Sequence, residues 1–188
     1  LTGVNRSGAR RAEGRGHERP GIRRMIHIFI GTKAQFIKTA PLMMEMTRRG
    51  MPYHLIETGQ HGALTADLIE EFGLRGADTR LRTESTNIAT LGQAALWCSQ
   101  TLLGLLSSPD AIAKKTFRGE SKGVCLIHGD TLTTLFSLLY ARRCGIPVAH
   151  VEAGLRSFHL FDPFPEELIR LVVMRYSDIL FAPSDWAM

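Results

Sequence analysis

The sequence predicts an α/β fold in which helices cover both faces of a doubly wound parallel sheet. Short runs of β-branched and other apolar residues alternate with longer stretches whose apolar residues recur at helical spacing. Polar clusters follow four of the short runs. Because parallel strands are joined by crossover helices, their carboxyl ends lie along one edge of the sheet, where such folds bind ligands.

The first half of the chain predicts two strands and three helices. The turn Gly31-Thr32 separates the first strand from the first helix, Gly50 ends that helix, and Ser107-Ser108-Pro109 breaks the third helix. An irregular stretch precedes the third helix. The expected elements are a strand at 26–30, a helix to about 49, a strand at 53–57, and helices at about 63–72 and 86–106.

The second half predicts three strands and two helices after a polar surface connection at 114–122. The last helix is entered through Asp162-Pro163-Phe164-Pro165-Glu166-Glu167, where proline and acids suit the first turn and its dipole. The expected elements are strands at 124–128, 147–151 and 178–182, and helices at 131–144 and 166–176.

Residues 1–24 differ in composition from the rest of the chain. They hold seven of the 23 basic side chains and two of the 18 acidic ones, which leaves 16 of each over residues 25–188. The body is therefore neutral and lacks the charge that a nucleic-acid-binding face needs. We expect 1–24 to be a disordered or artefactual basic leader, Met25 to be the natural start, and 25–188 to be one domain of a longer protein.

Three further classes of function are excluded by spacing and hydropathy. No apolar run approaches the ~18–20 residues that span a bilayer, so we expect no membrane partner. The seven histidines and three cysteines lack the spacing of metal or redox motifs, so we expect no metal and no cofactor. Cys98, Cys125 and Cys144 each lie in an apolar stretch, which predicts buried free thiols in a reducing cytoplasm.

The first polar cluster, Gly31-Thr32-Lys33, opens a helix whose amino terminus favours an anion. Lys38 lies in the first turns of that helix and either reaches a phosphate or remains an exposed lysine. Gln60 and His61 belong to the second cluster, Thr58-Gly59-Gln60-His61, which follows the second strand.

Two carboxylates directly follow later strands. Asp130, in Gly129-Asp130-Thr131, suits proton transfer or a sugar hydroxyl, although Asp or Thr at this place also predicts a helix cap. Glu152 ends a buried strand and is either an active carboxylate or the partner of Arg156.

Glu166 and Glu167 open the last helix, one turn before Arg170, so local ion pairs are the simplest role for that arginine. Three carboxylates on one rim, without metal ligands, indicate proton chemistry on an organic substrate.

Five motifs together resemble the UDP-N-acetylglucosamine 2-epimerase family, in the order and spacing of its signatures from about Met25 to Met188. They are GTKAQFIKTAPL at 31–42, TGQH at 58–61, HGDT at 128–131, HVEAGLR at 150–156 and PFPEE at 163–167. The resemblance implies that this chain is the N-terminal Rossmann-like domain of a two-domain, glycosyltransferase-B-like enzyme, and that most uridine and diphosphate contacts come from a C-terminal domain absent here.

The resemblance also implies a reaction. UDP is eliminated from UDP-N-acetylglucosamine as a proton leaves carbon 2, and UDP is then re-added to give UDP-N-acetylmannosamine for surface polysaccharide synthesis. By position, Asp130, Glu152 and Glu166 match the catalytic acids of the family. The implied substrate-binding residues are Lys33, Lys38, Gln60, His61 and Arg170. A homodimer of the complete protein, with a UDP-sugar as its ligand, is implied as well.

The chain departs from the family pattern at several places. Lys33 replaces an arginine, Gln35 replaces an acid and Gly62 replaces a frequent arginine, while Arg170 lacks the asparagine that usually precedes it. These changes bear on the sugar and on activation by a second substrate molecule. A hydrolysing 2-epimerase, a nucleotide-sugar glycosyltransferase of the same fold and a non-catalytic binding domain stay open as alternatives. The fragment alone is expected to be inactive.

Overall fold

The computed structural model describes residues 25–60, 66–82, 88, 90–120 and 122–187. Over this part the chain forms one six-stranded sheet, in the order β3-β2-β1-β4-β5-β6, in which all paired strands are parallel. The elements are β1 (Met25–Ile30), α1 (Lys33–Arg48), β2 (Tyr53–Glu57), α2 (Ala66–Glu71), β3 (Thr79–Arg80), α3 (Leu91–Leu105), α4 (Pro109–Thr116), β4 (Gly123–His128), α5 (Leu132–Arg143), β5 (Val148–Val151), α6 (Glu166–Tyr176) and β6 (Ile179–Phe181), followed by a short 3-10 turn, η1 (Asp185–Ala187). The predicted α/β fold is confirmed.

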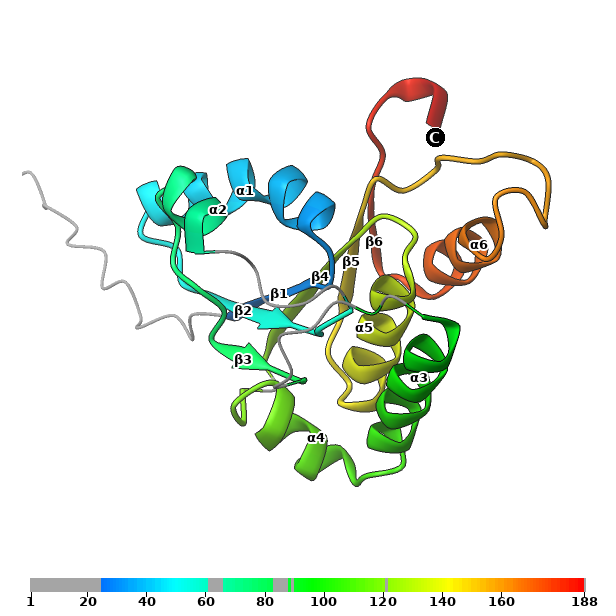
Figure 1. The fold of residues 1–188 in the computed structure, drawn as a ribbon. Coiled ribbons are helices and arrows are strands. Elements are labelled where there is room, and N and C mark those ends of the chain that lie inside the picture. Colours follow the sequence, from blue (N-terminus) through cyan, green and yellow to red (C-terminus); the bar gives the residue numbers. More distant parts are fainter. Residues whose placement is uncertain (1–24, 61–65, 83–87, 89, 121, 188) are drawn as a thin grey trace, which may run out of the picture.

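The sheet is the middle of three layers, with α1 and α2 on one face and α4, α5 and α6 on the other (Figure 1). Successive residues of β1 face opposite sides, so Ile28 and Ile30 pack under α1 whereas Phe29 packs in the core beneath α5. Both faces of the central strands are therefore apolar, which explains why these strands appear in the sequence as continuous apolar runs.

Most expected elements are present, and two of them, β2 and α6, have the expected ends. The helix expected at 86–106 begins later, at Leu91, because Thr90 and Gln93 form a capping box. Ile88 and Thr90 are not helical, and 86, 87 and 89 lie outside the described residues. The first three residues of the helix expected at 63–72 lie outside them as well.

The polar connection expected at 114–122 was wrong in its first part, which belongs to α4. The Ser108 side chain accepts a hydrogen bond from the Ala111 amide, and Pro109 occupies the first helical position. A serine–proline pair thus starts a new helix here as well as ending the previous one. The two-residue strand β3 was not predicted from the sequence.

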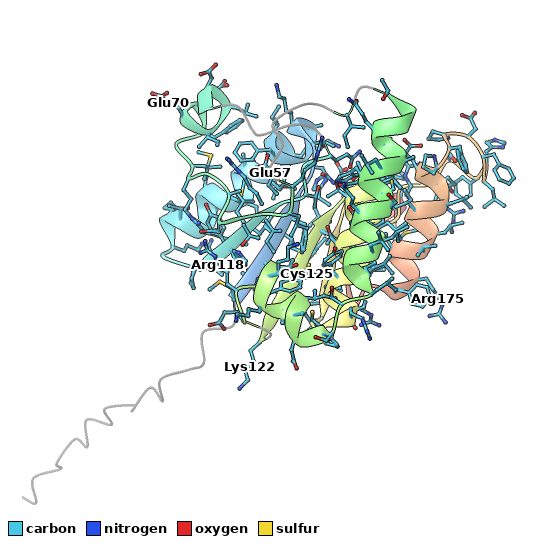
Figure 2. The ribbon with its side chains drawn as sticks, turned by 60° about the horizontal axis from the view of Figure 1, so that its bottom comes forward. Glu57, Glu70, Arg118, Lys122, Cys125 and Arg175 are labelled. Atoms are coloured by element: carbon cyan, nitrogen blue, oxygen red, sulfur yellow. The ribbon has the colours of Figure 1, made fainter. Side chains whose placement is uncertain are left out.

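The expectation of three buried thiols holds for one of them. Cys125 is buried beneath the helices, whereas Cys98 and Cys144 are half-buried because they lie on the outer sides of α3 and the end of α5. Figure 2 shows Cys125 inside the domain, and it shows Arg118 and Lys122 on the side where the strands begin, away from Glu57 at the end of β2.

Candidate functional site

The carboxyl ends of β1, β2, β4 and β5 carry the polar clusters that the sequence indicated. The turn after β4 is the centre of this rim. Gly129 adopts a left-handed φ of 72°, and a Cβ atom placed on it would lie 3.8 Å from Glu152 Oε2. The Glu152 carboxylate therefore lies against the turn that carries Asp130, as the rim hypothesis predicted.

Glu152 forms an ion pair with Lys38, and not with Arg156 as the simpler interpretation of the sequence predicted. Lys38 Nζ lies 2.8 Å from Oε1 and 3.0 Å from Oε2 of Glu152, joining α1 to the end of β5. The Lys38 side chain is 55% exposed and that of Glu152 is 26% exposed. The pair is open to solvent, so a ligand can reach both charges.

The backbone at Glu152 is strained. Its φ of 63° places a non-glycine residue in the left-handed region, which costs about 1 kcal/mol or more. Two residues later, Gly154 has a φ of 88°, and a Cβ atom there would come within 1.6 Å of the Ala187 carbonyl oxygen. Strain of this kind concentrates at functional sites, and here it directs the Glu152 carboxylate toward the rim.

Two histidines lie beside this carboxylate and are held neutral. His128 Nδ1 lies 3.8 Å from Glu152 Oε2. Burial lowers the pKa of His128 below its ordinary value; Glu152 opposes this shift and Lys38 adds to it. His150 Nε2 donates to the Gly129 carbonyl oxygen at 2.7 Å, and burial lowers the pKa of His150 as well. Neither imidazole therefore adds a positive charge at neutral pH.

Asp130 is held by Arg170 of α6. Arg170 Nε donates to Asp130 Oδ2 at 2.7 Å, and Nη2 contacts the same oxygen. Arg170 Nη1 also lies 3.3 Å from Glu167 Oε2, so the local ion pair expected for this arginine forms with Glu167, and no described contact joins it to Glu166. Thr131, and not Asp130, caps α5, which leaves the Asp130 carboxylate to the arginine.

Glu167 is the buried centre of this network, whereas the sequence predicted only its place in the first helical turn and a local ion pair with Arg170. Its side chain is fully buried and accepts from Arg156 Nε at 2.5 Å and from the Ser157 amide at 3.1 Å. Burial alone would raise the pKa of Glu167, but hydrogen bonds from Arg156, Ser157 and Arg170 lower it to about 2. Glu167 therefore fixes Arg170, which in turn positions Asp130.

Glu166 stands apart from the other two predicted acids. It is the first residue of α6, and its Oε2 atom is buried without a hydrogen-bond partner among the described residues. Within the described part of the chain, no hydrogen bond or ion pair connects Glu166 to Asp130 or Glu152. The structure thus brings together two of the three predicted acids and places the third at the adjacent helix start.

The remaining predicted binding residues divide into three cases. Gln60 is engaged, because its Oε1 accepts from Thr133 Oγ1 at 2.6 Å and from the Thr133 amide at 3.2 Å, at the amino terminus of α5. Lys33 begins α1 and is exposed. His61 lies outside the described residues.

Gln35 is a central residue of the rim to which the sequence assigned no role. It is buried, and its Oε1 accepts from the Gly31 amide at 2.9 Å. Its Nε2 donates to the His128 carbonyl oxygen at 2.8 Å and to Thr131 Oγ1 at 3.0 Å. One amide side chain therefore ties α1 to the end of β4 and the cap of α5. The departure at this position, glutamine for an acid, was the only signal in the sequence.

At the rim, the carboxylates are paired with cations, and the neutral imidazoles of His128 and His150 lie beside them. Carboxylates of this kind can accept a proton or a hydroxyl hydrogen bond, while the partner cations can bind an anionic group. Among the described residues, no three His, Cys, Asp or Glu side chains are placed to hold a metal ion. None of the described helices has the length and apolar character needed to span a bilayer.

Comparison with known protein families matches residues 44–188 to the family described as UDP-N-acetylglucosamine 2-epimerase. The UDP-N-acetylglucosamine 2-epimerase of Methanocaldococcus jannaschii is 34% identical over 164 residues, which cover 86% of this chain and 40% of that protein. The UDP-2,3-diacetamido-2,3-dideoxy-D-glucuronate 2-epimerase of Pseudomonas aeruginosa is 32% identical over 158 residues, which cover 82% of this chain and 40% of that protein.

Solved structures give the same result. The Neisseria meningitidis UDP-GlcNAc 2-epimerase bound to UDP-GlcNAc is similar with a TM-score of 0.68 and 30% identity, over 87% of this chain and 41% of that chain. The Methanocaldococcus jannaschii enzyme in complex with UDP-GlcNAc and UDP has a TM-score of 0.66 and 31% identity, over 87% and 41% of the two chains. This chain spans about two fifths of the length of the relatives it matches.

Proposed function

The chain belongs to the UDP-N-acetylglucosamine 2-epimerase family, and we propose that it is the N-terminal domain of an enzyme that inverts carbon 2 of UDP-N-acetylglucosamine. The observation that carries the proposal is the rim itself, where the Lys38–Glu152 and Arg170–Asp130 pairs lie at the carboxyl ends of parallel strands. In this proposal the nucleotide half of the cleft belongs to a second, C-terminal domain of the complete protein.

The proposed reaction needs a base, an acid and charge stabilisation. A carboxylate removes the proton from carbon 2 while the bond from carbon 1 to UDP breaks, and the electron pair leaves with UDP. The resulting 2-acetamidoglucal accepts UDP again at carbon 1 as a proton is delivered to the other face of carbon 2. Asp130, Glu152 and Glu166 are the proposed proton-transfer groups, and Lys38, which pairs with Glu152 and is 55% exposed, is a cation that a ligand can reach.

Arg170 has a positioning role in this proposal. It is one-fifth exposed and is held by Glu167, so it fixes Asp130 more than it offers a free charge to a ligand. Gln60 likewise fixes the start of α5 through Thr133. Lys33 and His61 complete the proposed substrate contacts. We propose that the complete protein is cytoplasmic, acts as a homodimer and supplies a precursor for surface polysaccharide.

Proton NMR of the complete protein with its substrate in deuterated water tests the proposal. We expect deuterium at carbon 2 and formation of UDP-N-acetylmannosamine. Release of free N-acetylmannosamine with UDP would identify a hydrolysing enzyme instead. Absence of exchange at carbon 2 in the folded protein would contradict the proposal for this sugar, and the uronate sugar of the Pseudomonas relative would be tried next.

Two substitutions at the rim separate catalysis from mere binding. Glu152→Gln and Asp130→Asn should each abolish turnover of the complete protein, because each removes a proton acceptor at nearly constant shape. Glu45→Gln is the matched control, since Glu45 is an exposed acid on α1 that pairs with Arg48 and Arg49. Full turnover in both rim variants would favour a non-catalytic binding domain. Residues 25–188 alone should show no turnover.

A further inference from the structure

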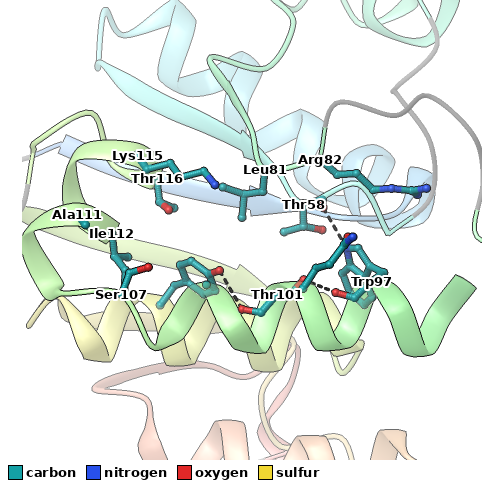
Figure 3. Close-up of a pocket in the computed structure, with 13 residues that line it drawn as sticks. Thr58, Leu81, Arg82, Trp97, Thr101, Ser107, Ala111, Ile112, Lys115 and Thr116 are labelled. Carbon is teal, nitrogen blue, oxygen red and sulfur yellow. Dashed lines mark hydrogen bonds between the residues drawn. The ribbon is translucent and has the colours of Figure 1, made fainter.

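A cavity of about 400 Å³ lies between α3, α4 and the end of β2, apart from the rim (Figure 3). It exists because α3 packs on α5 and not on the sheet. The Trp97 ring meets Phe136 edge-on at 5.2 Å, and the Tyr140 hydroxyl donates to the Thr101 carbonyl oxygen at 3.0 Å. Cavities of this size hold small organic ligands.

Thr116 contributes a hydroxyl group to the lining of this cavity. Thr116, the last residue of α4, is only 1% exposed and lines the cavity beside Ile112. Its hydroxyl has no hydrogen bond to any other described residue, although buried polar groups are nearly always paired. This hydroxyl can therefore form a hydrogen bond with a molecule bound in the cavity.

The charge of the lining selects an anion. Lys115 and Arg82 line the cavity from different elements, and no acidic residue is among its lining residues. Lys115 has no ion-pair partner in the described part of the chain, and Figure 3 shows its side chain running along the cavity toward Leu81. Arg82 donates to the Gly59 carbonyl oxygen, so Lys115 is the cation that the proposal uses. A lysine and hydroxyl donors suit a phosphate group, which carries more charge and more acceptor oxygens than a carboxylate.

The opposite part of the lining is apolar and planar. Trp97 is buried, and its Nε1 is already used by the Thr58 carbonyl oxygen at 3.2 Å, so its ring presents only carbon to the cavity. Leu81 lies across from it (Figure 3). This part of the cavity suits a flat or apolar body.

We propose that this cavity binds a small phosphate ester, with its phosphate at Lys115 and Thr116 and its apolar body against Trp97 and Leu81. The site is independent of the proposed catalytic one, because none of the predicted catalytic or substrate-binding residues lines it. Contact between the two is indirect, through Thr58, whose backbone holds Trp97 and whose hydroxyl lies 2.9 Å from Thr133 Oγ1 near the rim.

Fluorescence of Trp97 reports binding directly. Trp186, the other tryptophan of the chain, is exposed and can be replaced by phenylalanine so that Trp97 is observed alone. We expect phenyl phosphate to change the Trp97 emission saturably, with a Kd on the order of 1 mM for so small a probe. Inorganic phosphate should bind more weakly, and phenol should not compete below about 10 mM.

Two pairs of variants locate the site. Thr116→Val should weaken phenyl phosphate about fivefold, whereas Thr39→Val, at a buried threonine outside the cavity, should not change binding. Lys115→Gln should weaken it about tenfold, whereas Lys114→Gln, next to it but outside the lining, should not. No saturable response, an equal response in both members of either pair, or equal binding of phenol would overturn the proposal. None of these outcomes depends on epimerase activity.

Discussion

The two ends of the parallel strands bury polar side chains in opposite ways. Toward the amino-terminal end, His27 and His54 are buried as neutral imidazoles, with their Nδ1 atoms 3.1 Å apart. At the carboxyl end, Glu152 and Asp130 are each paired with a cation from another element. Neutral burial avoids the desolvation cost of an ion, whereas charged pairs accept it. Asp78 and Asp178, which directly precede β3 and β6, also form ion pairs, so the contrast is between the histidine pair and the rim.

The largest expected effect follows from removing the buried charge at the carboxyl end. Glu167→Gln leaves Arg156 and Arg170 without their shared carboxylate, so we expect the free energy of unfolding to fall by about 3 kcal/mol. Urea denaturation at pH 7 measures this loss. Glu45→Gln, at an exposed ion pair, should leave the free energy of unfolding nearly unchanged. A loss below about 1 kcal/mol in Glu167→Gln would mean that this end does not depend on charge.

At the amino-terminal end, the buried pair of His27 and His54 predicts that stability is lost when the pH falls. Burial, together with the nearby His54, lowers the pKa of His27 to about 4. A hydrogen bond with the Glu120 backbone acts in the other direction and raises this pKa. Burial also lowers the pKa of His54; Asp78 opposes this shift, while Arg118 and Arg75 add to it. The unfolded chain binds these protons below about pH 6.5, so stability is complete above that pH and declines as the pH falls toward 4.

We expect this decline to amount to about 2 kcal/mol for His27, measured as the unfolding free energy between pH 6.5 and 4.5. The stability that Glu167 contributes is lost mainly below this window, as the pH falls from the ordinary carboxyl pKa of 4.5 toward about 2. His27→Leu should flatten the dependence, whereas the exposed His159→Gln should leave it unchanged. An unchanged slope in His27→Leu would assign the acid sensitivity to the other buried histidines, His54, His128 and His150.

Substitutions of Gln35 compare a buried charged group with a buried neutral one at a single position of the rim. In Gln35→Glu, a carboxylate oxygen would face the His128 carbonyl oxygen, to which the native amide donates. We expect a loss of about 1.5 kcal/mol at pH 7, which becomes smaller as the pH falls and the new carboxyl group gains a proton. Gln35→Met removes the same hydrogen bonds without a charge, so its loss should not depend on pH. Equal losses at pH 7 and pH 5 in Gln35→Glu would refute this account.

These residues also show which parts of the structure the sequence could predict. The strands, and the rim at their carboxyl ends, follow from local patterns, so β2, α6 and the positions of Asp130 and Glu152 were predicted correctly. The charge partners of these two acids could not be predicted from local patterns, because Lys38 lies 114 residues from Glu152 and Arg170 lies 40 residues from Asp130. Arg156 was the nearer candidate for Glu152, but it is taken by the buried Glu167.

The smallest expected effect on stability concerns the ion pair that the proposed chemistry needs most. Because Lys38 is 55% exposed, Lys38→Gln should lower the free energy of unfolding by less than about 0.5 kcal/mol, and added salt should remove that difference. A double-mutant cycle with Glu152→Gln measures the coupling at low and high salt. Weak coupling means that a ligand can separate the two charges at little cost, as a binding site requires. A coupling above about 2 kcal/mol would instead place Lys38 and Glu152 with Glu167 among the groups that hold the fold, and the difference between rim and core would disappear.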